Sequence, residues 1–131
     1  MEGLIALDST VLIAFFRKKN KQNIFFYELT YEYSGFVVPA TVHYEIYVGT
    51  TLGQKQFWDN LFNDLILVSY TPDMNSTAIN ITNHLKSKQK SIDYKDLLIA
   101  ATALHYQHPL ATLNTAHFKD IADLKLITPQ I

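Results

Sequence analysis

The side chains most able to carry out chemistry in this sequence are three acids and one amide, which lie far apart along the chain: Asp8, Glu45, Asp96 and Asn114. The chain contains no cysteine, so a metal ion would have oxygen or imidazole ligands. Carboxylate and amide oxygens suit Mg²⁺ or Mn²⁺, which keep several waters and bridge to phosphate. Such ions activate water and stabilise the leaving oxygen when a phosphodiester is hydrolysed.

Three of these residues also have purely structural interpretations. Asp8 precedes a predicted helix, and aspartate is among the best residues for capping a helix N-terminus. Asp96 stands at the start of another predicted helix, where its charge favours the helix dipole, and Asp93 is equally placed to cap that helix. Asn114 follows a predicted strand and suits a turn. The sequence leaves both the structural and the functional interpretation open at each position.

Glu45 is the residue hardest to explain as a structural one. It lies in a predicted helix dominated by apolar residues, most of which we expect to be buried. A carboxylate in such a helix needs a partner, because burying an unpaired charge is very costly. The alternative is a position on a narrow solvent-exposed strip that Glu45 shares with Thr41 and Gly49.

Short apolar segments alternate with predicted helices along the whole chain. The expected strands are residues 4–7, 36–38, 65–68, 110–113 and 124–127. The expected helices are residues 11–16, 24–33, 39–49, 54–62, about 73–88, and 97–104. Gly35 is expected to break the second helix, and the last helix is apolar nearly all round, which predicts a buried central helix. This alternation predicts an α/β fold with a parallel sheet covered on both faces.

In open α/β sheets, ligands bind outside the carboxyl ends of the strands. Asp8 directly follows the first predicted strand and Asn114 follows the fourth, while Glu45 and Asp96 lie in helices that follow loops or strands. We therefore expect the four residues to meet at one rim of the sheet. Like charges gathered in this way require a cation.

Composition limits the remaining possibilities. A chain of 131 residues with 48% hydrophobic residues predicts a single domain over 1–131. The sequence shows no signal-peptide pattern and no apolar run long enough to span a membrane, which predicts a cytoplasmic protein without a membrane partner. The net charge of −1 makes no overall case for nucleic acid. Two local clusters could form phosphate-binding rims or solvated helix ends: Arg17, Lys18, Lys19 and Lys21, and Lys86, Lys88, Lys90 and Lys95.

Four segments, in chain order, resemble the sequence blocks of the PIN-domain family. Residues 7–13, LDSTVLI, resemble the opening block, and residues 41–49, TVHYEIYVG, resemble the second, in which Glu45 is the acidic residue. Residues 96–104, DLLIAATAL, are the most specific match, and residues 112–118, TLNTAHF, resemble the fourth block. Together the blocks span nearly the whole chain.

The resemblance implies a three-layer α/β/α fold with a central parallel sheet of about four or five strands. It implies an Mg²⁺- or Mn²⁺-dependent endoribonuclease, similar to the VapC toxin of a toxin–antitoxin pair. The implied partners are an RNA substrate, with tRNA as one candidate, a VapB-like antitoxin and a second copy of the chain in a homodimer. The implied site consists of the catalytic and metal-binding Asp8, Glu45 and Asp96, the metal-binding Asn114, and the supporting Ser9 and Thr112.

Two positions depart from the family pattern and keep other functions open. Asn114 stands where many relatives have a fourth acid, and Leu113 stands where a basic residue is common. One alternative is a non-catalytic PIN-like binding module, for which Asn114 is the only indication. Another is a haloacid-dehalogenase-like phosphohydrolase, which also places an aspartate after its first strand. That class has a second aspartate two residues later, where this chain has Thr10.

Overall fold

A computed structural model describes residues 2–20 and 24–129, so Lys21 of the first basic cluster lies outside the described residues. Its centre is a five-stranded sheet with the order β3-β2-β1-β4-β5, in which every pair of neighbouring strands is parallel. The strands are β1 (Glu2–Leu7), β2 (Tyr33–Pro39), β3 (Ile66–Val68), β4 (Leu110–Ala111) and β5 (Leu126–Ile127). The predicted α/β class with a parallel sheet is confirmed.

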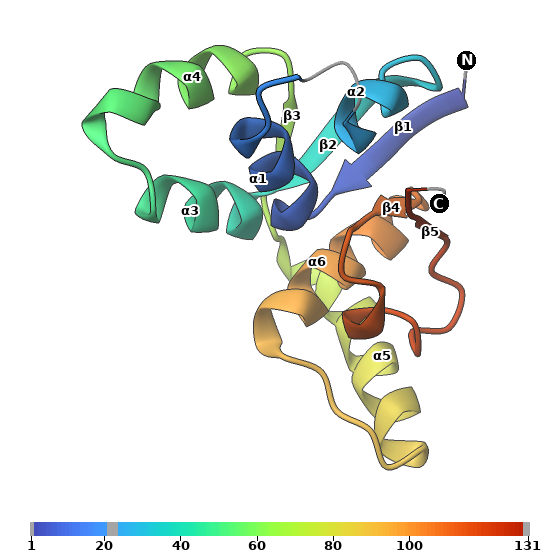
Figure 1. The fold of residues 1–131 in the computed structure, drawn as a ribbon. Helices are drawn as coiled ribbons and strands as arrows, with labels where there is room; N and C mark the ends of the chain where they lie inside the picture. Colours follow the sequence, from blue (N-terminus) through green and yellow to red (C-terminus); the bar gives the residue numbers. More distant parts are fainter. Residues whose placement is uncertain (1, 21–23, 130–131) are drawn as a thin grey trace.

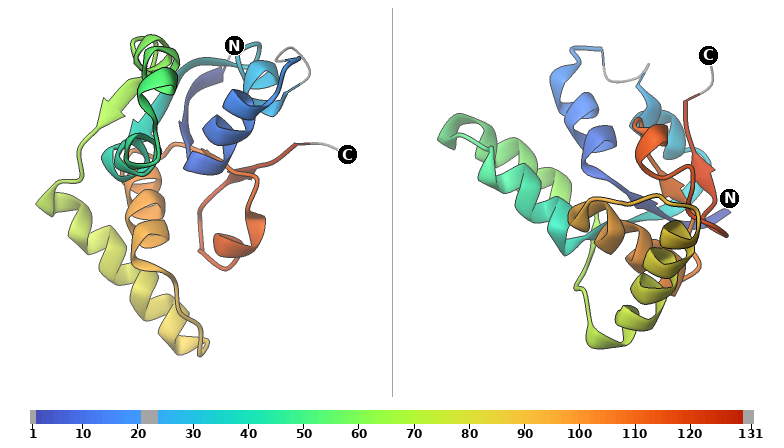
Figure 2. Two further views of the ribbon diagram at one scale, coloured as in Figure 1. Left: turned by 60° about the vertical axis from the view of Figure 1, so that its left-hand side comes forward. Right: turned by 90° about the horizontal axis from the view of Figure 1, so that it is seen from below.

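Helices flank this sheet on both sides, as Figures 1 and 2 show. They are α1 (Ser9–Arg17), α2 (Phe25–Leu29), α3 (Ala40–Val48), α4 (Leu52–Phe62), α5 (Asn75–Ser87) and α6 (Tyr94–His105), with short 3-10 turns η2 (Pro72–Met74) and η3 (Thr115–His117). The first four helices lie on one side of the molecule, and α5 and α6 pack together on the other. None of the helices within the described segments combines the length and apolarity needed to cross a bilayer.

The strand order explains these two helical layers. β1, β2 and β3 follow one another toward one edge of the sheet, whereas β4 lies on the other side of β1. Crossovers between parallel strands are right-handed, so the helices after β1 and β2 cover one face and the helices before β4 cover the other. The carboxyl ends of β1, β2 and β4 therefore share one rim with the first turns of α1 and α3.

The core lies between β1 and α6. Ile5, Ala6 and Leu7 of β1 are fully buried, because this central strand has neighbours on both sides and helices on both faces. In α6, the small residues Ala100 and Ala101 are also fully buried, which lets the helix approach the sheet closely. The prediction of a buried central helix is confirmed.

The predicted helix over residues 24–33 is wrong in its second half. α2 ends at Leu29, and Tyr33 already begins β2, where it pairs with Glu2 of β1. Gly35 does not break the chain between elements but lies inside β2, opposite Leu4. A Cβ at Gly35 would lie 2.8 Å from Leu4 Cδ2, so a larger residue there would displace the end of the Leu4 side chain.

Two further expectations are corrected by the structure. The strand expected over 110–113 ends at Ala111, because the backbone amides of Leu113 and Asn114 bond to threonine hydroxyls rather than to a neighbouring strand. The helix containing Glu45 is not mostly buried: Tyr44 is 68% exposed and Val48 is 67% exposed. Apolar residues on that face therefore point to solvent, which periodicity alone did not reveal.

Candidate active site

Asp8 is held from several directions at the carboxyl end of β1. Its Oδ1 accepts hydrogen bonds from the backbone nitrogens of Thr10 at 3.1 Å and Val11 at 3.4 Å and from Thr10 Oγ1 at 2.6 Å. Its Oδ2 accepts a hydrogen bond from Thr112 Oγ1 at 2.5 Å. Burial raises the pKa of Asp8, and these hydrogen bonds partly oppose that rise. Asp8 thus caps α1 and also presents a desolvated carboxylate to the rim.

The turn after β4 is fastened to the start of α1 by two threonine hydroxyls. Thr112 is fully buried, and its Oγ1 accepts a hydrogen bond from the backbone nitrogen of Asn114 at 2.9 Å. Thr10 Oγ1 accepts a hydrogen bond from the backbone nitrogen of Leu113 at 3.0 Å. Thr112 therefore lies where a supporting residue was expected. Ser9, the other expected supporting residue, is 7% exposed and directly follows Asp8.

Asp96 lies in the first turn of α6 and is 5% exposed. Its Oδ2 lies 2.9 Å from His117 Nδ1, and His117 Nε2 lies 3.0 Å from Asn114 Nδ2. These contacts fit an imidazole that donates from Nδ1 to Asp96 and accepts at Nε2 from the Asn114 amide. Asp93 is the N-cap of α6 but makes no capping bond through its side chain. The charge of Asp96 also lies in the first turn, where it favours the helix dipole.

One continuous series of contacts now joins four of the predicted site residues. Asp8 bonds to Thr112, whose hydroxyl bonds to the backbone of Asn114, and the Asn114 side chain contacts His117, which contacts Asp96. Residues that are more than 100 positions apart in the sequence thus belong to one network. The network lies at the carboxyl ends of β1 and β4, as the parallel sheet predicted.

Glu45 reaches the site from α3 and has a different kind of partner. Its Oε2 lies 3.0 Å from Lys95 Nζ, and this hydrogen bond raises the pKa of Lys95, to which the charges of Asp96 and Asp93 also contribute. Glu45 Oε1 and Thr41 Oγ1, one turn earlier in α3, are buried atoms without a hydrogen-bond partner among the described residues. A buried carboxylate oxygen without a partner is costly, so it marks a place for a cation or a bound water.

The four predicted ligands do not form a ready-made coordination cluster. Within residues 2–20 and 24–129, no three histidine, aspartate or glutamate side chains are placed to hold one metal ion together. Asp96 is turned toward His117, and Glu45 is turned toward Lys95. The shared rim is present, whereas a common metal site of these residues stays a prediction.

Sequence reasoning missed the roles of three residues at this site. Thr10 entered as part of the first sequence block and as the residue in place of a second acid, Lys95 as a member of a basic cluster, and His117 as part of the fourth block. Each contacts a predicted site residue through its side chain: Thr10 contacts Asp8, Lys95 contacts Glu45, and His117 contacts Asp96. The adjacency of Lys95 to Asp96 was a usable signal, but the pairing of Lys95 with Glu45 crosses 50 residues and has no local signature.

A cavity of about 220 Å³ opens beside Glu45, between α1 and the helices α3 and α4. Phe16, Trp58 and Ile46 supply apolar walls, and Arg17 adds a positive charge. The cavity therefore combines an acid, a base and aromatic surface next to the candidate site. The cavity offers room for a bound polymer that brings either a phosphate group or a basic side chain next to Glu45 and Arg17.

Comparisons with known proteins agree with this architecture. A family model described as PIN domain matches residues 5–124, a span that contains all the candidate residues. Ribonuclease VapC1 of Methanocaldococcus jannaschii is 27% identical over 126 residues, which cover 95% of this chain and 86% of that protein. Ribonuclease VapC of Rickettsia bellii is 46% identical over 48 residues, only 37% of this chain and 36% of that protein. A crystal structure of VapBC2 from Rickettsia felis bound to a promoter DNA fragment contains a chain with a TM-score of 0.80 at 19% identity, with 97% of this chain and 99% of that chain covered.

Proposed function

The chain belongs to the PIN domain family, and we propose that it is a divalent-metal-dependent endoribonuclease, the toxin of a VapBC-type toxin–antitoxin pair. The observation that carries this proposal is the pair of buried carboxylates, Asp8 and Asp96, which one network of contacts connects at the carboxyl rim of a parallel sheet. Relatives named ribonuclease VapC, which align with most of the chain, support the choice of RNA.

The donor set fits a hard divalent cation. Asp8, Glu45, Asp96 and Asn114 offer only carboxylate and amide oxygens, and Glu45 Oε1 is buried without a partner. We propose that these four residues hold Mg²⁺ or Mn²⁺. When bound, such an ion supplies Lewis-acid activation of the phosphate and lowers the pKa of a bound water.

The chain's own residues would prepare the site for an RNA phosphate. The hydrogen bonds from Thr10 and Thr112 keep Asp8 in one orientation, and His117 does the same for Asp96 through Nδ1. The ammonium group of Lys95 stands beside Glu45, so it reduces the repulsion between the acids and an arriving phosphate. Hydrolysis then forms a bond between a water oxygen and phosphorus and breaks one P–O ester bond of the RNA.

The two alternative functions receive less support. In a haloacid-dehalogenase-like enzyme a second carboxylate would follow Asp8 by two residues, but here Thr10 bonds to Asp8 through its hydroxyl. The family model that matches the chain is the PIN domain, which does not favour that alternative. A non-catalytic binding module would not need two buried acids at the same rim, because each costs free energy of folding.

A cleavage assay tests the proposed function. The purified protein is incubated with structured RNA in Mg²⁺, in Mn²⁺ or in excess chelator, and the products are separated on a gel. We expect cleavage in the presence of either ion and none with chelator. Undiminished cleavage in chelator would contradict the metal dependence. Hydrolysis of small phosphomonoesters without RNA cleavage would instead support a phosphohydrolase, and RNA binding without cleavage would support a binding module.

We also propose that an antitoxin segment covers the face between α1 and α3. Three apolar side chains on α3 and at the start of α4 are solvent-exposed: Tyr44 at 68%, Val48 at 67% and Leu52 at 92%. Solved VapBC complexes share this fold, which supports a partner of the VapB type. Co-purification with the product of a neighbouring reading frame tests this. Val48→Asp should weaken such a complex, and an unchanged complex would place the antitoxin elsewhere.

A homodimer is a further part of this proposal. Ile79 and Tyr94, which are 57% and 75% exposed, flank a hollow of about 260 Å³ that also includes Tyr70 and Leu98. An exposed apolar region of this kind suits a second copy of the chain. Analytical ultracentrifugation should show a dimer that Ile79→Glu weakens, and a monomer at all concentrations would contradict this part of the proposal.

A further inference from the structure

A cluster of positive charge lies on the surface between the end of α5 and the segment that follows η3. Lys88, Lys90 and Lys119 are exposed, and Lys90 Nζ lies 2.9 Å from Asp120 Oδ1. The hydrogen bond from Lys90 lowers the pKa of Asp120, and the charges of Lys90, Lys119 and Lys88 also contribute to this lowering. These three lysines, here called the lysine cluster, face one carboxylate, so a net charge of about +2 remains.

The backbone that carries this cluster is well defined. α5 ends at Ser87, and Gln89 adopts a left-handed conformation with φ 59°. The backbone nitrogen of Lys90 then donates to the Leu85 carbonyl oxygen at 2.8 Å, as in a Schellman C-cap. Lys88 and Lys90 therefore stand on a hydrogen-bonded turn rather than on a frayed helix end.

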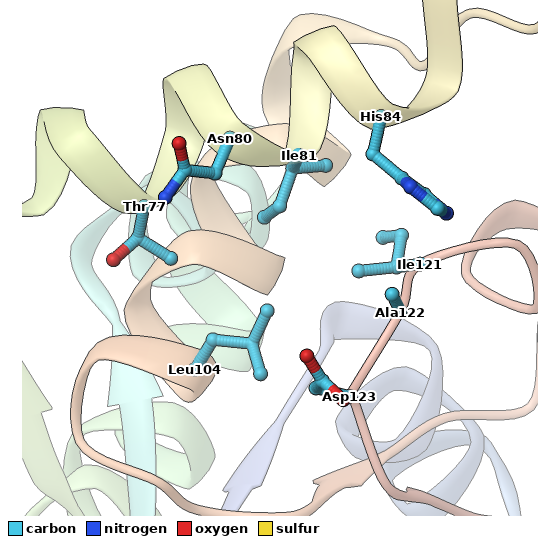
Figure 3. Close-up of a pocket in the computed structure, with 8 residues that line it drawn as sticks. All are labelled: Thr77, Asn80, Ile81, His84, Leu104, Ile121, Ala122 and Asp123. Carbon is cyan, nitrogen blue, oxygen red and sulfur yellow. The ribbon is translucent and has the colours of Figure 1, made fainter. Parts of the chain in front are cut away.

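Beside the lysine cluster, α5 and the segment 121–123 enclose a cavity of about 360 Å³ (Figure 3). Thr77, Asn80 and His84 line it from α5, and Asp123 lines it from the opposite wall. Its apolar surface comes from four further side chains, Ile81, Leu104, Ile121 and Ala122. His84 lies one turn before Lys88, the C-cap of α5, and Ile121 directly follows Asp120, so the cavity adjoins the lysine cluster.

The same segment connects this surface to the candidate active site. His117 contacts Asp96 at 2.9 Å, and Asp120, three residues later, contacts Lys90 at 2.9 Å. Three residues span at most roughly 11 Å of chain. An RNA strand whose cut phosphate lies at Asp8 and Asp96 could therefore reach the lysine cluster with a phosphate a few nucleotides further along the strand.

We propose that the lysine cluster and the adjoining cavity form a second contact site for single-stranded RNA, with phosphates on the lysines and one unstacked base in the cavity. This inference rests on the proposed ribonuclease function and deepens it. The cavity provides what a base requires: hydroxyl, amide and carboxylate groups for its polar edge, an imidazole, and aliphatic side chains for its faces. An acidic protein segment would use the lysines but would leave the polar cavity walls unpaired, so RNA fits the whole surface better.

The binding experiment uses the full chain in excess chelator, so that RNA is bound but not cut. Fluorescence anisotropy of a labelled 12-nucleotide single-stranded RNA is measured between 0.05 and 0.3 M salt, conditions that expose counterion release. The variant Lys88→Gln/Lys119→Gln removes two charges and keeps the Lys90–Asp120 ion pair. The variant Lys55→Gln/Lys125→Gln removes two exposed lysine charges that lie outside both basic clusters and outside the lysine cluster, and it is the matched control.

We expect the lysine-cluster variant to reduce the slope of log Kd against log salt by about 1.4, because each lost phosphate contact on a single strand contributes about 0.7. If the two proteins bind RNA equally at 1 M salt, this difference in slope means that the variant binds on the order of 25-fold more weakly than the wild type at 0.1 M salt. The control should keep the wild-type slope. An unchanged slope in the lysine-cluster variant, or an equal loss in both variants, would overturn the inference.

The cavity is tested separately with Asn80→Ala/His84→Ala at pH 8. Neither substitution removes a lysine of the cluster, so we expect binding weakened about tenfold with an unchanged salt slope. If this variant binds RNA with wild-type affinity, no base occupies the cavity and that part of the inference is wrong. Labelled poly-glutamate of equal charge is the protein-like probe. If it binds as tightly as RNA and loses affinity equally in the lysine-cluster variant, the surface recognises acidic polymers and the RNA assignment is wrong.

Cleavage kinetics distinguish this inference from the proposed function. With Mg²⁺ or Mn²⁺, the lysine-cluster variant should raise KM for the 12-nucleotide RNA and leave cleavage of a dinucleotide unchanged. If the wild type binds RNA through the cluster but cuts nothing, the proposed function fails and the contact site stands. If the wild type cleaves and KM for both substrates is unaffected in the variant, the function stands and the contact site is wrong.

Discussion

Asp8 lies at the start of α1 and Glu45 lies in the neighbouring helix α3, and the protein holds the two acids in different ways. Asp8 is 3% exposed, and groups from α1 and from the segment after β4 donate hydrogen bonds to both of its oxygens. Glu45 has a side chain that is 29% exposed, one oxygen paired with the half-exposed Lys95, and one buried oxygen without a partner. One acid is fixed by the fold, and the other is held by a long, flexible side chain.

This difference indicates where the site is preorganised and where it can adapt. The partners of Asp8 lie in the packed core, so its position should be the same with and without ligand. Lys95 can leave Glu45 at little cost, because an exposed ion pair contributes about 0–1 kcal/mol. We therefore expect ligand binding to move the Glu45 side of the site and to leave the Asp8 side unchanged.

The largest effect should come from Asp8→Asn. Asparagine caps helices about as well as aspartate, so the fold should persist, while RNA cleavage should fall by at least about a hundredfold as a charged ligand is lost. Added Mn²⁺ should raise the melting temperature of the wild type much more than that of the variant. Full activity with an unchanged Mn²⁺ response would reduce Asp8 to a helix cap.

The same variant has a pH signature in metal-free buffer. Burial raises the pKa of Asp8 in the folded state, so the stability that its protonated form contributes is present below the unfolded value of 3.8 and is lost as the pH rises through the folded pKa. Above the folded pKa the folded state carries a desolvated carboxylate, and there Asp8→Asn should be equally stable or more stable. Urea unfolding at pH 7 and at pH 3.5 should show this advantage shrinking at the lower pH.

A smaller effect is expected from Thr112→Val, which tests whether Thr112 holds Asp8 in its position. Valine fills the same space but leaves Asp8 Oδ2 and the backbone nitrogen of Asn114 without their partner, a loss of about 1–3 kcal/mol in the free energy of unfolding. Thr102→Val is the matched control, because the buried Thr102 hydroxyl donates to a Leu98 carbonyl that belongs to a helix. Chemical denaturation should show a larger loss for Thr112→Val, and equal losses would mean that Asp8 is not held by Thr112.

Asn114→Asp should moderately strengthen metal binding, whereas Asp8→Asn should weaken it. A charged oxygen replaces an amide at the rim, so Mn²⁺ affinity should rise severalfold while cleavage is retained. Asn114→Ala should be milder than Glu45→Gln in both metal affinity and rate. If Asn114→Ala changes neither quantity, Asn114 is a turn residue only, which isothermal titration with Mn²⁺ would reveal.

The smallest effect on stability should come from Lys95→Met, which tests the adaptable side. Loss of an exposed ion pair should change the free energy of unfolding by less than about 1 kcal/mol. Mn²⁺ should bind a few-fold more tightly, because the competing ammonium group is gone. Lys55→Met, which breaks the exposed Lys55–Asp59 pair, is the control and should leave Mn²⁺ binding unchanged. Weaker Mn²⁺ binding in Lys95→Met would show that Lys95 organises Glu45 rather than competing for it.

Local sequence patterns predicted the elements that are covered by neighbours on every side in the core. Continuous apolar runs identified β1 and the buried face of α6, because such runs survive only where neighbours cover every side. The helix predicted through Tyr33 failed because pairing with β1 outweighed the helical pattern of its aromatic residues. The exposure of Tyr44 and Val48 was equally hidden from sequence reasoning, because an exposed apolar residue and a buried one look the same in the sequence.

By itself, the sequence determined which residues could form the site and that two of them, Asp8 and Asn114, follow strands of one parallel sheet. Asp8 and Asn114 were placed correctly because the residue after a strand must lie at the carboxyl rim. Only the tertiary structure decided the partners: Thr112 with Asp8, His117 with Asp96, and Lys95 with Glu45. The pairs lie 104, 21 and 50 residues apart, and no local preference of the chain encodes a contact over such separations. Those contacts follow from the order of the strands, because β4 inserts beside β1 and brings the end of the chain back to its beginning.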